Sequence, residues 1–183
     1  MRSLVLGLSL LMAGCTGIPE NVNPVEPFSL EKYLGTWYEI ARLDHSFERG
    51  LSRVTAEYSM RDDGGVRVIN KGYSEEKKAW SQAEGRAYFV ERPDLGYLKV
   101  SFFCIFYGSY VVVDLDREGY QYALVCGPST SYLWILARSP RLAKDILDRL
   151  VSKAAALGFD TSRLIVVDHS PESPGLQAPP ASP

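Results

Sequence analysis

Residues 35–42 have the sequence GTWYEIAR, and they begin the first of a series of short strands. Side chains in such a strand alternate between its two faces. Trp37, the largest side chain of the stretch, is suited to plug the closed end of a tapering barrel. We therefore place Trp37 on an inner face and expect Glu39 and Ala41 to follow it there.

Further strands come downstream, separated by turns that contain Gly or Asp. With 37–43 they make eight strands without helical crossovers, which favours an antiparallel up-and-down sheet. Closure removes exposed edges, so we predict an all-β, eight-stranded antiparallel up-and-down β-barrel, with a β-sandwich as the alternative. The seven further strands are expected at 52–60, 66–73, 80–91, 97–103, 109–115, 121–126 and 132–138.

One amphipathic helix comes after the strands. Ser139 is a suitable N-cap, Pro140 fits the first helical position, and Gly158 ends the segment. Apolar side chains between them recur at helical spacing, so this helix needs an apolar surface to cover. We predict that it packs outside the barrel and that 164–167 adds a last short strand at the barrel edge.

The N-terminal residues indicate export. Residues 1–14 contain a basic start and an apolar run that is too short to span a membrane, as in an export signal that is removed. The string LMAGC at 11–15 resembles a bacterial lipobox, which implies acylation of Cys15; an ordinary secretory signal is the alternative. Thr16 stands where an Asp would signal inner-membrane retention, which points to the outer membrane.

The chain therefore divides into four parts. Residues 1–14 form a lipoprotein signal peptide, and 15–27 contain the lipidated cysteine and a semi-extended, Pro-containing linker. The barrel with its helix occupies 28–170, and 171–183 form a disordered, Pro-rich tail.

Composition gives no sign of nucleic-acid or metal binding. The chain has 20 Lys and Arg and 22 Asp and Glu, so charge offers no reason to propose nucleic acid. Three cysteines and two histidines are too few and too scattered for an obvious metal site, and we expect no cofactor. His45 and His169 are expected at the surface or rim.

Three motifs in order resemble the lipocalin family. Gly35, Trp37 and Tyr38 match its G-x-W-Y signature. Asp114 lies in the motif at the turn between the sixth and seventh strands, and Arg138 matches the arginine that closes the eighth. The guanidinium of Arg138 can stack on the Trp37 ring, which gives both residues structural roles.

Nearly the whole mature chain is similar to the branch of the family that contains bacterial outer-membrane lipoproteins and apolipoprotein D. The resemblance implies a lipid-anchored protein at the periplasmic face of the outer membrane. It also implies that the protein stores or transports fatty acids or lysophospholipids for membrane maintenance and catalyses no reaction. Whether the protein forms a homodimer is left open.

Alternation also predicts the barrel lining. Small alanines mixed with aromatic residues leave volume inside, which favours an apolar cavity over a packed core in a purely structural envelope lipoprotein. Glu39 and Asn70, with Tyr58 or Tyr110, either orient a ligand head group or satisfy one another. The expected ligand-binding residues are Glu39, Ala41, Ala56, Tyr58, Asn70, Ala87, Val100, Phe102, Tyr110, Val125 and Trp134.

Cys104 and Cys126 are expected at one rim of the barrel, at the ends of two strands that are not adjacent. Two strand spacings amount to roughly 10 Å, too far for a disulfide without help from a loop. A bridge and two free thiols both stay open, and a lipid-modifying enzyme using a rim cysteine is the alternative to a binding protein. Three roles stay open for the neighbouring apolar residues: an apolar lip against a membrane, a self-association patch, or simple packing under the loop. These residues are Phe103, Ile105, Phe106 and Tyr107.

Overall fold

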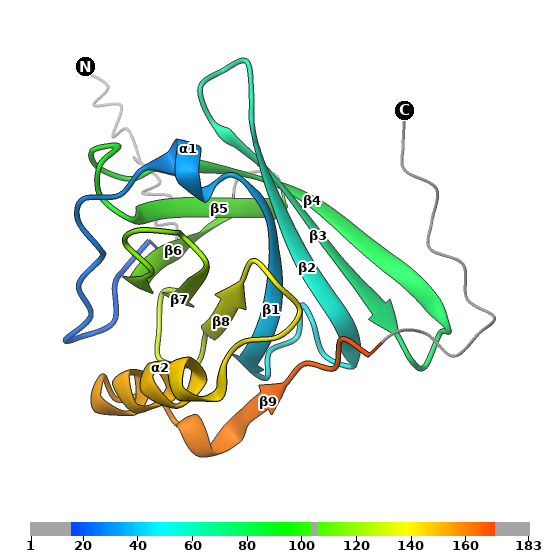
Figure 1. The fold of residues 1–183 in the computed structure, drawn as a ribbon. Coiled ribbons are helices and arrows are strands. Elements are labelled where there is room, and N and C mark those ends of the chain that lie inside the picture. The colour runs from blue at the N-terminus through cyan, green and yellow to red at the C-terminus, as the bar shows by residue number, and fades with distance from the viewer. Residues whose placement is uncertain (1–15, 104–105, 171–183) are drawn as a thin grey trace, which may run out of the picture.

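Nine β-strands form one antiparallel sheet in the computed structural model, which describes residues 16–103 and 106–170 (Figure 1). Their order is β2-β3-β4-β5-β6-β7-β8-β1-β9, and a further pairing between β1 and β2 closes the first eight into a barrel. The predicted fold is therefore confirmed. The strands are β1 Gly35–Leu43, β2 Leu51–Met60, β3 Val66–Ser74, β4 Ala79–Phe89, β5 Tyr97–Phe103, β6 Phe106–Leu115, β7 Tyr122–Cys126, β8 Leu133–Ala137 and β9 Leu164–Val166.

Helix α2 (Lys144–Ala156) packs outside the barrel, as predicted, but begins later than expected. Its N-cap is Ala143, because the Ser139 hydroxyl is engaged in a local turn with the backbone of Arg141. Ser side chains compete with helix formation by bonding nearby backbone groups in this way. A short 3-10 helix, Thr161–Arg163, then leads into β9.

The barrel wall separates two apolar clusters. The outer cluster lies between the wall and α2, where Leu150 and Ala154 are fully buried against strand residues such as Leu124. Asp114 at the end of β6 fixes the helix electrostatically, since its Oδ2 lies 3.2 Å from Arg149 Nη1 and 2.6 Å from Lys153 Nζ. The second cluster fills the inside of the barrel.

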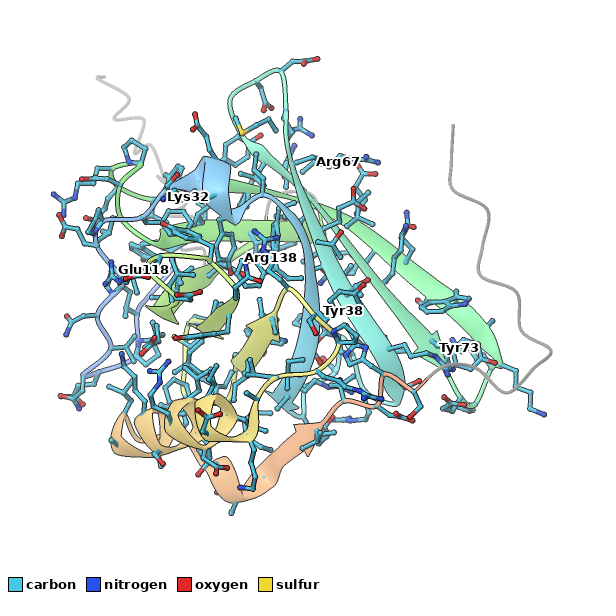
Figure 2. The ribbon with its side chains drawn as sticks, viewed as in Figure 1. Lys32, Tyr38, Arg67, Tyr73, Glu118 and Arg138 are labelled. Atoms are coloured by element: carbon cyan, nitrogen blue, oxygen red, sulfur yellow. The ribbon has the colours of Figure 1, made fainter. Side chains whose placement is uncertain are left out.

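A short helix, α1 (Leu30–Tyr33), covers one end of the barrel above the fully buried Trp37. The indole Nε1 donates to the Tyr33 carbonyl at 2.8 Å. Arg138 lies over the indole ring, 3.9 Å from its centroid, so the expected cation–π pair is confirmed. Arg138 also donates to three backbone carbonyls, those of Thr36, Lys32 and Tyr120 (Arg138 and Lys32 are labelled in Figure 2).

Strand β1 is irregular at its middle. Its register against β8 shifts between Glu39 and Ala41. Before the shift β1 pairs with β2, and after it with β9. The shift inverts the alternation of side chains, as β-bulges do, so Ala41 joins the outer cluster beneath α2. The expectation that Ala41 lines the interior is therefore wrong, and Arg42 points inward in its place.

Residues 16–27, expected to be a linker, lie against the barrel wall instead. The backbone of Val25 bonds to Val112 at 2.8 Å and to Gly96 at 2.9 Å. Ser109 Oγ donates to the Gly17 carbonyl at 2.6 Å. This segment, dark blue in Figure 1, therefore runs along β5 and β6 on the outside of the barrel. The expected signal peptide, Cys15 and the Pro-rich tail lie outside the described residues.

The segment 167–170 bridges the seam where β2 leaves β1. Val167 N donates to the Ile40 carbonyl on β1 at 3.0 Å. Across the seam, Arg53 N on β2 donates to the Asp168 carbonyl at 2.8 Å. The last described residues therefore complete the barrel where β1 and β2 diverge.

We predict that Arg138→Ala lowers the free energy of unfolding by about 3 kcal/mol, because it removes three hydrogen bonds and a cation–π contact of about 1 kcal/mol or less each. Urea denaturation of the variant and the wild type measures this change. Arg163→Ala, which removes an exposed arginine, serves as the control. Equal stability of the two variants would contradict the role assigned to Arg138.

Candidate ligand-binding site

The inner face of the barrel is apolar but incompletely buried. A barrel interior filled by its own side chains would bury them fully. Here several inward side chains pack against the interior cluster and yet stay partly exposed: Ala56, Phe89, Val100, Phe102, Tyr110 and Trp134. The interior is therefore accessible to solvent along part of its wall.

The structure brings together most of the residues that alternation predicted. Asn70 shares the face of Ala56, its register partner on β2. Glu39 is buried with Arg42, near the end of the barrel opposite α1. The interior cluster contains eight of the predicted residues: Ala56, Tyr58, Ala87, Val100, Phe102, Tyr110, Val125 and Trp134.

The β3–β4 hairpin leaves part of the inner wall uncovered. β4 pairs with β5 only from Arg86 to Phe89, whereas it pairs with β3 from Ala79 to Ala87. Figure 1 shows the ends of β3 and β4 projecting beyond β5. Gly85 lies under the ring of Phe102, and a Cβ there would come within 2.8 Å of that ring. The glycine thus lets Phe102 lie flat against β4 at the edge of the uncovered wall.

Three tyrosine hydroxyls meet near the closed end. Tyr110 Oη lies 2.7 Å from Tyr33 Oη and 2.9 Å from Tyr58 Oη. Burial raises the pKa of all three phenols above their ordinary value, so each keeps its proton. Three hydroxyl hydrogens serve only two hydrogen bonds within this group, which leaves one donor for a further partner.

Asn70 supplies an acceptor on the same inner face. Its Oδ1 is buried and has no hydrogen-bond partner among the described residues. A buried amide oxygen without a partner is costly, by about 1–3 kcal/mol. The interior therefore holds one unused donor near the tyrosines and one unused acceptor at Asn70, which suit a ligand or water with both functions.

A charged cluster lies under the β1–β2 loop, residues 44–50, at the other end of the barrel. Arg42 Nη1 donates to Glu39 Oε1 at 2.6 Å, and its Nη2 donates to the Glu48 carbonyl at 2.9 Å. Trp134 Nε1 donates to Glu48 Oε2 at 3.0 Å. His45 Nε2 lies 3.2 Å from the same oxygen, although its N–H is poorly aligned with it.

The pKa values of Glu39 and Glu48 are shifted in opposite directions. Burial, and then the Glu48 carboxylate, raise the pKa of Glu39 well above its ordinary value, against the opposing effect of Arg42. Burial alone would also raise the pKa of Glu48, but hydrogen bonds with His45, Glu39 and Trp134 outweigh it and lower that pKa. Glu39 therefore keeps its proton to a higher pH than Glu48 does.

Sequence reasoning missed four residues of the interior. Tyr33 lies in a helical turn before the first strand, where alternation has no meaning. Arg42 points inward only because of the irregularity in β1. His45 and Glu48 are both 7% exposed in the β1–β2 loop, so His45 lies at the rim, as one of the two expectations had it, but is buried there.

The other signature residues have structural surroundings. Gly35 has φ +91, which only glycine adopts readily, and it lies beside Arg138. Tyr38 is half-buried on the outside of β1, where its ring meets that of His169 edge to face at 5.6 Å (Tyr38 is labelled in Figure 2). His169 Nε2 lies 2.8 Å from the Glu39 carbonyl.

Cys126 is a free, fully buried thiol. It belongs to the outer cluster, on the side of the wall away from the interior, and burial raises its pKa to about 12. A disulfide with Cys104 is therefore not formed, and a thiol so placed is a poor nucleophile for an interior ligand. Cys104 and Ile105 lie outside the described residues.

Two other kinds of site are not found in the described part of the chain. Within residues 16–103 and 106–170, no group of His, Cys, Asp and Glu side chains is arranged to hold a metal ion. No helix in these ranges is long and apolar enough to cross a membrane.

Comparison with known families agrees with the barrel and its signature residues. Residues 28–169 match the model of the lipocalin-like domain family. The chain therefore belongs to the lipocalin family, as the three motifs predicted.

Individual relatives refine the position within the family. The chain is 61% identical to the outer membrane lipoprotein Blc of Vibrio cholerae over 168 residues, which cover 91% of this chain and 98% of that protein. It is 54% identical to the Blc of Escherichia coli K12, over 81% of this chain and 84% of the relative. Apolipoprotein D of Mus musculus is 29% identical over 79% of each chain.

Solved structures agree on the fold alone. Insecticyanin of the tobacco hornworm superposes with a TM-score of 0.63 at 24% identity, over 84% of this chain and 87% of that one. The sequence relatives, and not these structures, confirm the predicted relationship to bacterial outer-membrane lipoproteins and to apolipoprotein D.

We predict that Glu39→Gln flattens the dependence of stability on pH. An unfolded glutamate loses its proton near a pH of about 4.3, whereas folded Glu39 keeps its proton to a higher pH. Between these two values the folded state binds more protons, so the free energy of unfolding falls as pH rises. Glutamine cannot lose a proton, and the variant lacks this decline.

Urea denaturation at several values from pH 4 to pH 8 compares the variant with the wild type. Glu57→Gln, at an exposed position of β2, is the matched control and should behave like the wild type. The same slope in all three proteins would show that Glu39 is ionised throughout this range.

Proposed function

We propose that the protein is a lipoprotein anchored by Cys15 at the periplasmic face of the outer membrane and that its barrel binds a fatty acid or a lysophospholipid. The observation that carries the binding proposal is the set of inward, apolar and incompletely buried side chains. The names of the Vibrio and Escherichia relatives support the location, and they denote lipoproteins. The corresponding role is storage or transport of such lipids for membrane maintenance.

An acyl chain fits the chemistry of this wall. Each methylene moved from water to an apolar surface gains about 0.8 kcal/mol, before the cost of ordering the chain. Burial of the chain then dominates affinity. Val100, Phe102 and Val125 supply apolar surface, and the small side chains of Ala56 and Ala87 leave width between the larger ones.

The polar groups of the interior orient the bound lipid. The unused hydroxyl hydrogen of the tyrosine group is a donor, and Asn70 Oδ1 is an acceptor. A protonated carboxyl group has one acceptor and one donor to match them. The charged cluster around Arg42 and Glu48, at the opposite end, is placed to meet the head group of a longer lipid.

We predict that Ala56→Trp weakens fatty-acid binding at least about tenfold, because the larger side chain occupies the width that Ala56 leaves. Native mass spectrometry of the delipidated mature protein, with added palmitate or lysophosphatidylethanolamine, measures binding and stoichiometry together. Ala155→Trp on the exposed face of α2 is the control and should bind as the wild type does. Absence of any bound lipid on an intact wild-type barrel would overturn the proposed function.

Tyr110→Phe tests whether the tyrosine hydroxyls orient the bound lipid. We expect about a fivefold loss of palmitate affinity, the effect of one hydrogen bond of roughly 1 kcal/mol. Displacement of a fluorescent fatty acid gives the dissociation constants. Tyr107→Phe, on the outer face of β6, should leave them unchanged. Unaltered affinity in Tyr110→Phe would assign the tyrosine hydroxyls to an internal network without contact to the ligand.

A further inference from the structure

The anchor point of the chain is fixed to one wall of the barrel. The Tyr97 hydroxyl donates to the Thr16 carbonyl, and Ser109 Oγ donates to the Gly17 carbonyl at 2.6 Å. Cys15 directly precedes these residues. Because a residue spans at most about 3.6 Å, a membrane held by Cys15 could not be far from Gly17. An acyl group on Cys15 therefore brings the membrane to the outside of β5 and β6.

The same two strands carry the most exposed aromatic pair of the described chain. Phe103 is 66% exposed and Phe106 is 74% exposed, and the two are register partners across β5 and β6. Phe106 is three residues along β6 from Ser109, a distance of about 10 Å. Exposed phenylalanines beside a lipid anchor are suited to enter the apolar part of a bilayer.

Basic and amphipathic side chains lie on the outer face of the same strands, whereas alternation directs Phe106 to the face opposite Tyr107. The Tyr107 ring lies on the outer face of β6, with Lys99 Nζ 5.2 Å and the Arg86 guanidinium 5.9 Å from its centroid. Aromatic rings at the membrane–water interface, with Lys and Arg reaching toward lipid phosphates, are typical of membrane-contacting surfaces. The chemistry of the wall and the position of the anchor are independent observations that agree.

We propose that the barrel docks onto the leaflet that holds the acyl chains of Cys15 through the end of β5 and the start of β6, where Phe103 and Phe106 are exposed. Phe103 and Phe106 enter the leaflet, and Lys99 and Arg86 face its phosphates. Acylation of Cys15 belongs to the proposed function, on which this inference rests.

Docking in this way places the entrance of the barrel at the membrane. In an up-and-down barrel, the β5–β6 turn is at the same end as the β1–β2 loop. That loop carries His45 and Glu48, next to the accessible interior. A single-chain lipid then passes between leaflet and barrel along the hairpin without crossing the aqueous periplasm.

The test separates the hairpin from the anchor. The mature chain with Cys15→Ser is mixed with vesicles of phosphatidylethanolamine and phosphatidylglycerol, and the bound fraction is measured by sedimentation. In this background we expect Phe103→Ser with Phe106→Ser to weaken binding about tenfold, through loss of two apolar side chains. Met60→Ser with Val166→Ser is the matched control, since these positions are 53% and 70% exposed and lie outside the proposed docking surface. This control should bind as its parent does.

Three results would overturn the proposal: no vesicle binding by the parent, no loss in the hairpin variant, or an equal loss in the control. Sedimentation velocity without vesicles adds a fourth, since a dimer of the parent that the hairpin variant loses would assign the patch to self-association. Palmitate affinity of the same proteins is read in parallel. Intact palmitate binding with no vesicle binding removes this inference and leaves the proposed lipid binding in place.

The acylated chain gives a second measurement. The mass of the protein purified from membranes reports whether Cys15 carries acyl chains. In vesicles with brominated lipids, Phe106→Trp should add a tryptophan signal that is strongly quenched, whereas Val166→Trp should add one that is not. Equal quenching at both positions would contradict the docking face.

Discussion

The register shift in the middle of β1 determines how the rest of the molecule is arranged. Before the shift, Trp37 points inward and pairs with Arg138 at the closed end. After it, Ala41 points outward beneath α2 and Arg42 points inward. Without the shift, a regular alternation would leave the Arg42 guanidinium on the helix-facing side and its carboxylate partner inside, each without compensation. Strand β1 thus contributes a residue to the closed end, to the surface beneath α2 and to the charged cluster.

The interior has a polar group at each end and an apolar wall between them. At the closed end the tyrosine hydroxyls bond to one another. At the other end Arg42 donates to Glu39 and to the Glu48 carbonyl, and the Glu48 carboxylate accepts from Trp134 and lies beside His45. These polar side chains bond mainly to one another, so the rest of the wall can stay apolar and incompletely filled. Fold and site therefore depend on different side chains of the same strands.

Sequence pattern predicted the features that regular alternation dictates. Strand order, closure, the outer position of α2 and the inward side chains from Ala56 to Trp134 all result from period-two strands joined by short turns. The pattern failed where a strand irregularity, a local turn or a tertiary contact decides. The irregularity of β1 reversed Ala41, and a local Ser139 turn delayed the helix. Hydrogen bonds to β5 and β6 fixed a segment whose composition is that of a linker.

The seam between β1 and β2 has a consequence for the order of folding. His169 contacts Glu39 across 130 residues of sequence, and the neighbouring Asp168 contacts Arg53, which is also near the start of the chain. Contacts between such distant positions form late, because the loop between them must first be ordered. A chain that emerges from its N-terminus therefore exposes an unpaired sheet edge until its last strand is available. Until then this edge is the surface most open to pairing with another chain.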